Sequence, residues 1–169
     1  FSPTTGDRLP LAGDTTGLRS YQVATFDLRS QIDDLSVVLG DGWYEVEAAD
    51  DFRSPEWQWS RKDATLSFRN PGRGVLVYLQ LDQPSAAFSA PQRVEVLAGS
   101  EVVDSFLLPA GRTELRRIQV AASQLGATET AELTISVDRT FVPAAVPALK
   151  SVDKRELGIR VFRAFIQPL

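Results

Sequence analysis

Apolar side chains recur at every second position through most of this chain, and this alternation constrains the fold more than any other feature of the sequence. In residues 132–138, for example, Leu133, Ile135 and Val137 alternate with polar residues. Successive side chains of a β-strand point to opposite faces, so such a segment buries one face and exposes the other. Alternating or continuous apolar patterns predict further strands at residues 21–28, 42–47, 56–60, 64–69, 74–81, 93–97, 102–108, 114–120 and 156–166.

Turn-forming residues separate the predicted strands at the spacing of about 8–12 residues that is typical of a β-sandwich or barrel. The Ala98-Gly99-Ser100 turn predicts a hairpin. Residues 69–74, with the sequence RNPGRG, predict a second tight hairpin, because they lack the spacing of a phosphate-binding loop and no helical pattern follows. The sequence therefore predicts an all-β fold, an antiparallel β-sandwich of roughly eight to ten strands with jelly-roll topology.

Helical patterns are confined to two short segments. Residues 28–39 carry Leu or Ile at positions i, i+4, i+7 and i+11, which predicts one short amphipathic helix. Residues 121–126 predict a single helical turn ended by Gly126. Residues 1–20 hold three Gly, two Pro and six Ser or Thr and predict a linker or extended arm. Residues 21–169 are then expected to form a single β-sandwich domain.

The last predicted strand changes its apolar face partway along. Apolar residues occupy odd positions from Leu157 to Val161 and even positions from Phe162 to Ile166. A β-bulge near residues 161–163 would reset the register; alternatively, the strand is covered on both faces. In either case we expect this segment to lie deep in the fold.

Three residue types are missing, and their absence narrows the functions open to the chain. It contains no Cys, no His and no Met. Without Cys and His it has no catalytic triad, no thiolate metal site and no histidine general base, so we predict that it is not an enzyme and carries no cofactor. Its net charge of −4 argues against a nucleic-acid partner. A chain without Met that begins at Phe1 is expected to be part of a longer or processed protein.

Two groups of motifs resemble a known module. The segment GWYEVE, a tryptophan-bearing strand and ATLSFRNP resemble its opening, and a Phe-Val-Pro run followed by a loop and Asp-x-Arg-Glu-Leu-Gly resembles its closing segment. The module is the C-terminal extracytoplasmic β-sandwich, similar to jelly-roll carbohydrate-binding domains, of bacterial glycosyltransferase-like membrane proteins. The resemblance covers roughly residues 40–168 and rests in its closing part on Phe141, Val142, Pro143, Asp153, Arg155, Glu156, Leu157 and Gly158.

This resemblance implies a non-catalytic accessory domain of a bacterial envelope glycan protein, located outside the cytoplasm and tethered to a membrane protein. Its expected partners are an oligosaccharide or polysaccharide and the membrane-embedded remainder of its parent chain. The alternative is a structural or protein-interaction β-sandwich module that binds no glycan. An enzyme is the weakest of the three hypotheses.

The tryptophans are the first candidates for a glycan site. Trp57 and Trp59 are two residues apart, so in a strand they share a face with a separation of about 7 Å along the chain. An indole ring can stack on the apolar face of a sugar, but the same two rings can also fill the core. Trp43 begins another predicted strand, and its burial is left open.

Charged residues around the tryptophans complete the candidate carbohydrate-binding site. Glu45, Arg53 and Arg61 could hydrogen-bond sugar hydroxyls, or the arginines could bind an anionic sugar or a phosphate. The alternative is that these charges are solvated and pair with one another on the surface. Asp50 and Asp51 are candidate ligands for a structural Ca²⁺, although the spacing matches no EF-hand loop. Arg155 is predicted to have a structural role, holding a turn through nearby carboxylates and backbone carbonyls.

Overall fold

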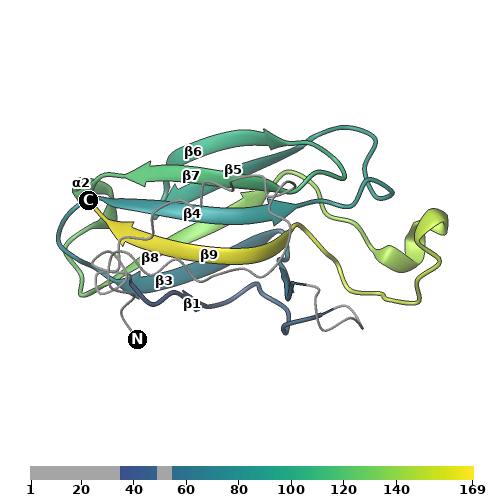
Figure 1. Cartoon of the computed structure of the whole chain (residues 1–169), viewed down its shortest axis with the longest axis horizontal. Helices are drawn as coiled ribbons and strands as arrows, with labels where there is room; N and C mark the ends of the chain where they lie inside the picture. The colour runs from purple at the N-terminus through teal and green to yellow at the C-terminus, as the bar shows by residue number, and fades with distance from the viewer. Residues whose placement is uncertain (1–34, 49–54) are drawn as a thin grey trace, which may run out of the picture.

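A computed structural model describes residues 35–48 and 55–169, and it places them in two antiparallel β-sheets packed face to face (Figure 1). The five-stranded sheet has the order β1 (Val38–Leu39), β3 (Asp63–Arg69), β8 (Thr130–Val137), β5 (Gln92–Ala98), β6 (Glu101–Leu108). The four-stranded sheet has the order β2 (Gln58–Trp59), β9 (Arg160–Pro168), β4 (Val75–Asp82), β7 (Glu114–Val120). The helical elements in the described part are α2 (Ala122–Leu125), η1 (Pro143–Ala145) and η2 (Pro147–Leu149). The predicted all-β antiparallel sandwich is confirmed.

The alternation in the sequence produces the core between the two sheets. In β3 and β8 every second side chain is buried, including Leu66, Phe68, Leu133 and Ile135. β4 lies between β9 and β7 and is buried at most of its positions, as its continuous apolar run predicts. Burial of a Val, Leu, Ile or Phe side chain stabilises the fold by about 1.5–3 kcal/mol, so this layer is the main source of stability.

The chain passes from one sheet to the other at every connection from β1 to β9 except the β5–β6 hairpin. This alternation between sheets is the connectivity expected of a jelly roll. The hairpin turns at Gly99, as predicted, and Gly99 has a φ of 60°. The hairpin predicted at residues 69–74 is wrong, because β3 and β4 lie in different sheets. Asn70 instead fixes this turn by donating hydrogen bonds to the carbonyls of Gly126 and Thr128, at 3.1 and 3.0 Å.

The predicted β-bulge in the last strand is confirmed. Gln80 pairs with Arg163 and Leu81 pairs with Val161, so Phe162 is the extra residue in β9. Val161 and Ile166 have opposite parity, so in a regular strand only one of them would face the core. The bulge between them allows both to be buried there. β9 has neighbours on both sides, β2 and β4, and it is therefore an internal strand of its sheet.

The predicted helix at residues 28–39 is wrong over its described part. Val38 and Leu39 form β1 and pair with Ser67 and Leu66 of β3. An extended segment that contacts two sheets can also carry apolar residues at helical spacing. Here the pairing with β3 makes the segment a strand and not a helix. Residues 28–34, the predicted strand at 21–28 and the boundary at residue 20 lie outside the described residues. The predicted helical turn is confirmed as α2, which ends at Gly126 with a φ of 71°.

Among the described glycines, Gly42 leaves the least room for a side chain, because neighbouring backbone occupies the position of its Cβ. Its φ is 84°, and a Cβ atom there would lie 2.0 Å from the carbonyl oxygen of Asp63. We expect Gly42→Ala to lower the free energy of unfolding by about 2 kcal/mol, because the turn must move away from β3. Gly99 is the matched control, since it also has a positive φ but nothing within 4 Å of its Cβ position. Urea unfolding should show a smaller loss for Gly99→Ala, and equal losses would contradict the proposed contact.

Candidate functional site

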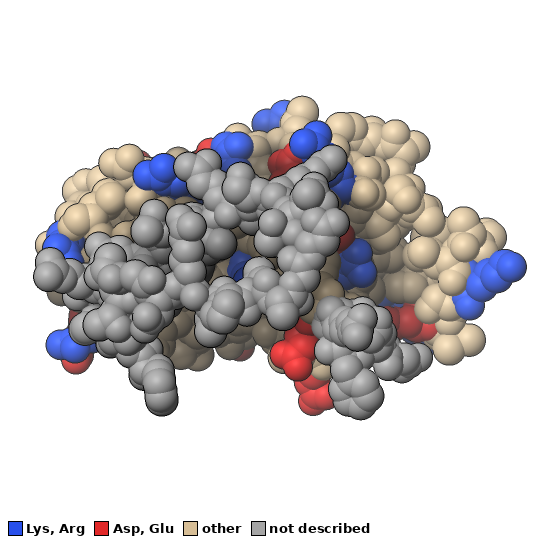
Figure 2. Space-filling view, in the orientation of Figure 1, with Lys and Arg blue, Asp and Glu red and all other residues tan. Residues whose placement is uncertain are grey.

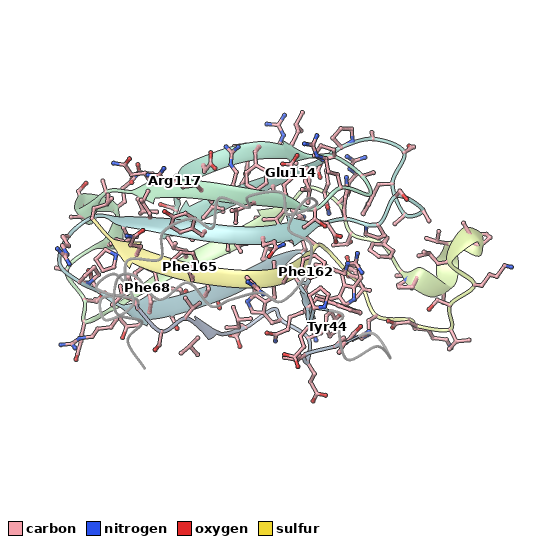
Figure 3. The ribbon with its side chains drawn as sticks, viewed as in Figure 1. Tyr44, Phe68, Glu114, Arg117, Phe162 and Phe165 are labelled. Atoms are coloured by element: carbon pink, nitrogen blue, oxygen red, sulfur yellow. The ribbon has the colours of Figure 1, made fainter. Side chains whose placement is uncertain are left out.

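A pocket of about 290 Å³ lies at the end of the sandwich where β9 begins, beside the connection from β8 to β9. The yellow-green part of this connection, which includes η1 and η2, projects beyond the sheets in Figure 1. Figure 3 shows Tyr44 and Phe162 near the same end. We call this the tryptophan pocket. Its lining residues are Glu47, Trp57, Trp59, Pro84, Phe141, Pro143, Leu149, Ser151, Asp153, Arg155, Leu157 and Arg160.

Both indoles of residues 56–60 (EWQWS) line this pocket, because Trp57 and Trp59 are two residues apart in an extended segment and share a side. Trp59 is 8% exposed and packs edge-on against Phe141, with ring centroids 5.7 Å apart. Trp57 is half-buried and packs edge-on against Phe162 at 6.4 Å. Trp59 therefore belongs to a small apolar cluster, and Trp57 packs against this cluster but is only partly buried.

Arg160 lies between the two tryptophans and joins them to β4. Its Cζ atom lies 5.3 Å from the ring centroid of Trp57 and 5.5 Å from that of Trp59. Its Nε and Nη2 donate hydrogen bonds to the two carboxylate oxygens of Asp82, both at 2.8 Å. This fork-to-fork pair fixes the guanidinium plane, and the cation over the rings holds the indoles in place. Asp82 has only 8% of its side chain exposed.

Arg155 forms a second ion-pair group at the pocket. It donates hydrogen bonds to both carboxylate oxygens of Asp153, the shortest 2.7 Å, and to Glu47 Oε1 at 2.7 Å. Its Cζ atom also lies 5.0 Å from the ring centroid of Tyr44. These hydrogen bonds, that to Asp153 first, raise the pKa of Arg155 above its usual value. The hydrogen bond from Arg155 lowers the pKa of Asp153 below 3.8, so both groups stay charged at neutral pH.

The side chain of Arg155 contacts the carboxylates of Asp153 and Glu47 and the Tyr44 ring, and it donates to no backbone carbonyl of the described residues, contrary to that part of the prediction. The backbone amide of Arg155 also donates to Asp153 Oδ1, at 2.9 Å. Two distant parts of the chain meet here, residues 44–47 and residues 153–156. Glu47 precedes Arg155 by 108 residues, and Tyr44 donates its hydroxyl hydrogen to the carbonyl of Glu156 at 3.0 Å.

The other predicted site residues lie away from the pocket or outside the described part. Trp43 packs against the main core and donates its Nε1 hydrogen to the carbonyl of Thr65 at 2.7 Å. Glu45 and Arg61 are exposed, and Arg61 lies over the Tyr44 ring at 5.1 Å. The remaining predicted residues, all outside the described part, are Arg53, Asp50 and Asp51.

Several pocket residues were not predicted from the sequence. Arg160 begins β9, and its partner Asp82, which does not itself line the pocket, ends β4; only the pairing of those strands brings them together. Phe141 and Leu149 come from the long connection before β9, where the sequence has no regular period. The sequence signal for Phe141 is the Phe-Val-Pro run, which carries part of the resemblance and does not by itself predict a pocket residue.

The pocket combines apolar walls with planar hydrogen-bonding groups. Indole, proline and leucine surfaces form the walls, and Ser151, Asp153, Arg155 and Glu47 supply polar atoms. This arrangement suits an amphipathic ring with hydroxyl groups at its edge. Within residues 35–48 and 55–169, no group of three or more acidic side chains lies close enough to hold a metal ion.

The face of the molecule shown in Figure 2 carries basic and acidic side chains interspersed over its described parts. Over the described parts visible there, neither sign forms a broad patch of the kind that would attract a polyanion. No described helix is long and apolar enough to cross a membrane.

No known family model matches the sequence, and no curated protein does. Solved structures with a similar course of the chain include a carbohydrate-binding module of Cellvibrio mixtus lichenase 5A, in complex with cellotriose. It is 10% identical, with 80% of this chain and 98% of that chain covered and a TM-score of 0.42. A module from Clostridium stercorarium in complex with cellobiose is 8% identical, with 79% and 92% covered and a TM-score of 0.39.

An adhesin domain of Lys-gingipain from Porphyromonas gingivalis is 12% identical, with 80% of this chain and 90% of that chain covered and a TM-score of 0.45. At these identities the similarities concern the path of the chain, and no ligand or activity carries over from them.

Proposed function

We propose that this domain is a non-catalytic carbohydrate-binding module and that the tryptophan pocket is its glycan site. The observation that carries the proposal is the meeting of Trp57 and Trp59 with Arg155 and Asp153 in one open pocket. A sugar ring has an apolar face that stacks on an indole and hydroxyl groups that accept and donate hydrogen bonds. Trp57 supplies accessible ring surface, and Arg155 and Asp153 supply fixed donors and acceptors.

We further propose that the domain works outside the cytoplasm as an accessory part of a bacterial envelope glycan protein. The resemblance of residues 40–168 to the extracytoplasmic module of glycosyltransferase-like membrane proteins supports this role. The absence of Cys and His supports a binding role over a catalytic one. The expected partner besides a glycan is the membrane-embedded remainder of the parent chain.

The second candidate is a structural or protein-interaction module. One observation favours it: Trp59, Phe141 and Leu157 form a buried apolar cluster that fixes the connection before β9. On this hypothesis the aromatic rings serve stability alone, and no sugar perturbs them. The response of Trp57 to a bound sugar distinguishes the two candidates, because only a glycan site predicts that a sugar covers this ring.

Trp57→Ala tests the proposed function. We expect the dissociation constant for the best-bound oligosaccharide on a glycan array to rise at least about tenfold, because truncation of a central aromatic contact costs more than about 1 kcal/mol. Calorimetric titration measures the change, and circular dichroism checks that the variant is folded. Trp43→Phe is the control, since Trp43 does not line the pocket and should leave binding unchanged.

The proposal fails if no array glycan binds the unmodified domain. It also fails if binding persists in Trp57→Ala with unchanged affinity. Tryptophan fluorescence gives an independent reading, since a bound sugar should protect Trp57 from iodide quenching.

A further inference from the structure

We infer that the tryptophan pocket takes an uncharged sugar and rejects uronic acids and other anionic glycans. This inference rests on the proposed function and names the class of ligand for the same site. It departs from the expectation that arginines beside the tryptophans could bind an anionic sugar. Its basis is that the two guanidinium groups that line the pocket, those of Arg155 and Arg160, already have carboxylate partners within the protein.

Arg155 already has two carboxylate partners. Its Nε contacts both oxygens of Asp153, at 3.1 and 3.0 Å, and its Nη2 reaches Asp153 and Glu47, both at 2.7 Å. An anionic ligand is bound best through two parallel N–H donors of one guanidinium group. The Nε and Nη2 edge that would do this is occupied, so a ligand carboxylate would have to displace one from the protein.

Arg160 is occupied in the same way. Its Nε and Nη2 contact the two oxygens of Asp82 at 2.8 Å, and aromatic rings lie over the guanidinium plane. At Arg155 both N–H groups of Nη2 are used, so only the N–H groups of Nη1 have no acceptor among the described residues; at Arg160 this holds for Nη1 and for the second N–H of Nη2. Because each guanidinium already has a protein carboxylate as its counter-charge, these N–H groups suit a hydroxyl oxygen, which carries no charge to be neutralised.

The charge balance of the pocket points the same way. Among the charged residues that line the pocket, Glu47 and Asp153 balance Arg155 and Arg160, and Asp82, the buried partner of Arg160, brings this set to one net negative charge. A further carboxylate would face like charges in a partly desolvated pocket, and such juxtaposition weakens binding strongly. A neutral sugar meets no such penalty.

Lys150 and Lys154 are exposed neighbours of lining residues in the sequence, and Arg61 is a further cation, at the Tyr44 ring that Arg155 also covers. It is exposed and lies over the Tyr44 ring, 5.1 Å from the centroid, but it is not among the residues that line the pocket. In water its attraction to a ligand carboxylate is screened by salt. We therefore expect Arg61 to contribute little to the choice between neutral and acidic sugars.

The test is calorimetric titration of the full chain with paired oligosaccharides that differ in charge alone. Suitable pairs are oligogalacturonate with its methyl ester, and array glycans that end in glucose or glucuronate. We expect each neutral member to bind at least about tenfold more tightly than its acidic partner. An acidic member that binds as tightly or more tightly overturns the inference and leaves the proposed function standing. Absence of binding by every glycan overturns the proposed function itself, and the inference with it.

Glu47→Gln provides a second test of the inference with the same pairs of oligosaccharides. It removes a carboxylate from Arg155 without a large change in shape, so the affinity for the acidic member relative to the neutral one should rise about tenfold. Arg61→Gln is the matched surface control and should leave this ratio within about twofold. A ratio that Glu47→Gln does not move, or that Arg61→Gln moves as much, contradicts the assignment.

Discussion

A chain truncated after Arg155 will not fold. It lacks β9, an internal strand that joins β2 to β4, and with it the buried side chains of Leu157, Ile159, Val161 and Ile166. Their burial stabilises the fold by about 6–12 kcal/mol in total, which is comparable with the whole stability of about 5–15 kcal/mol of a small domain. We expect the fragment to show no cooperative thermal transition and to aggregate, as measured by circular dichroism and light scattering.

Removal of Leu169 alone is the control. This residue is half-exposed, and its amide donates one hydrogen bond to the carbonyl of Gly74 at 2.8 Å. One such bond contributes about 1 kcal/mol, so the shortened chain should fold with a small loss of stability. A soluble, cooperatively unfolding fragment 1–155 would show that β9 is not essential to the fold.

Asp82→Ala is expected to have the second-largest effect. It leaves the guanidinium of Arg160 without its counter-charge, in a site where Asp82 is 8% and Arg160 28% exposed. Removal of one partner of a buried ion pair costs about 3–5 kcal/mol, and the partial exposure of Arg160 places the expected loss near the lower end, at about 3 kcal/mol. Urea unfolding measures the loss. The Arg160 side chain should also move relative to the indoles and change the tryptophan fluorescence.

Asp104→Ala is a matched control for this variant. Asp104 accepts the same two-bond contact from Arg116, at 2.8 and 3.0 Å, but these side chains are 20% and 37% exposed. An exposed pair of this kind contributes about 0–1 kcal/mol. If the two variants lose the same stability, burial is not what makes the Asp82–Arg160 pair important.

The strands could be predicted from the sequence because their signal is local. Alternation along β3 and β8 fixes which side chains face the core, and the change of parity between Val161 and Ile166 locates the bulge at Phe162. Segments without a single period were harder to predict. Val38 and Leu39 share helical spacing with residues before them, and their contact with β3 decides that they are extended.

The site could be predicted only in part. The shared face of Trp57 and Trp59 follows from their spacing, and both rings line the pocket. How far each ring is buried depends on Phe141 and Phe162, which come from other parts of the chain. Trp43 has the same residue type but packs on the main core instead, with its backbone bridged to Ser60 and its Nε1 donating to Thr65 of β3.

The sequence by itself determined the class of fold, the inward faces of most strands and the exclusion of histidine and cysteine chemistry, because these depend on residue type and on neighbours one or two positions away. The tertiary structure decided which charges meet the tryptophans. Asp82 and Arg160 are 78 residues apart, and Glu47 and Arg155 are 108 apart. No local pattern relates them, since the pairing of β4 with β9 sets the first distance and the path of the connection before β9 sets the second. EWQWS is thus a wall of a pocket whose chemistry comes from strands far away in the sequence.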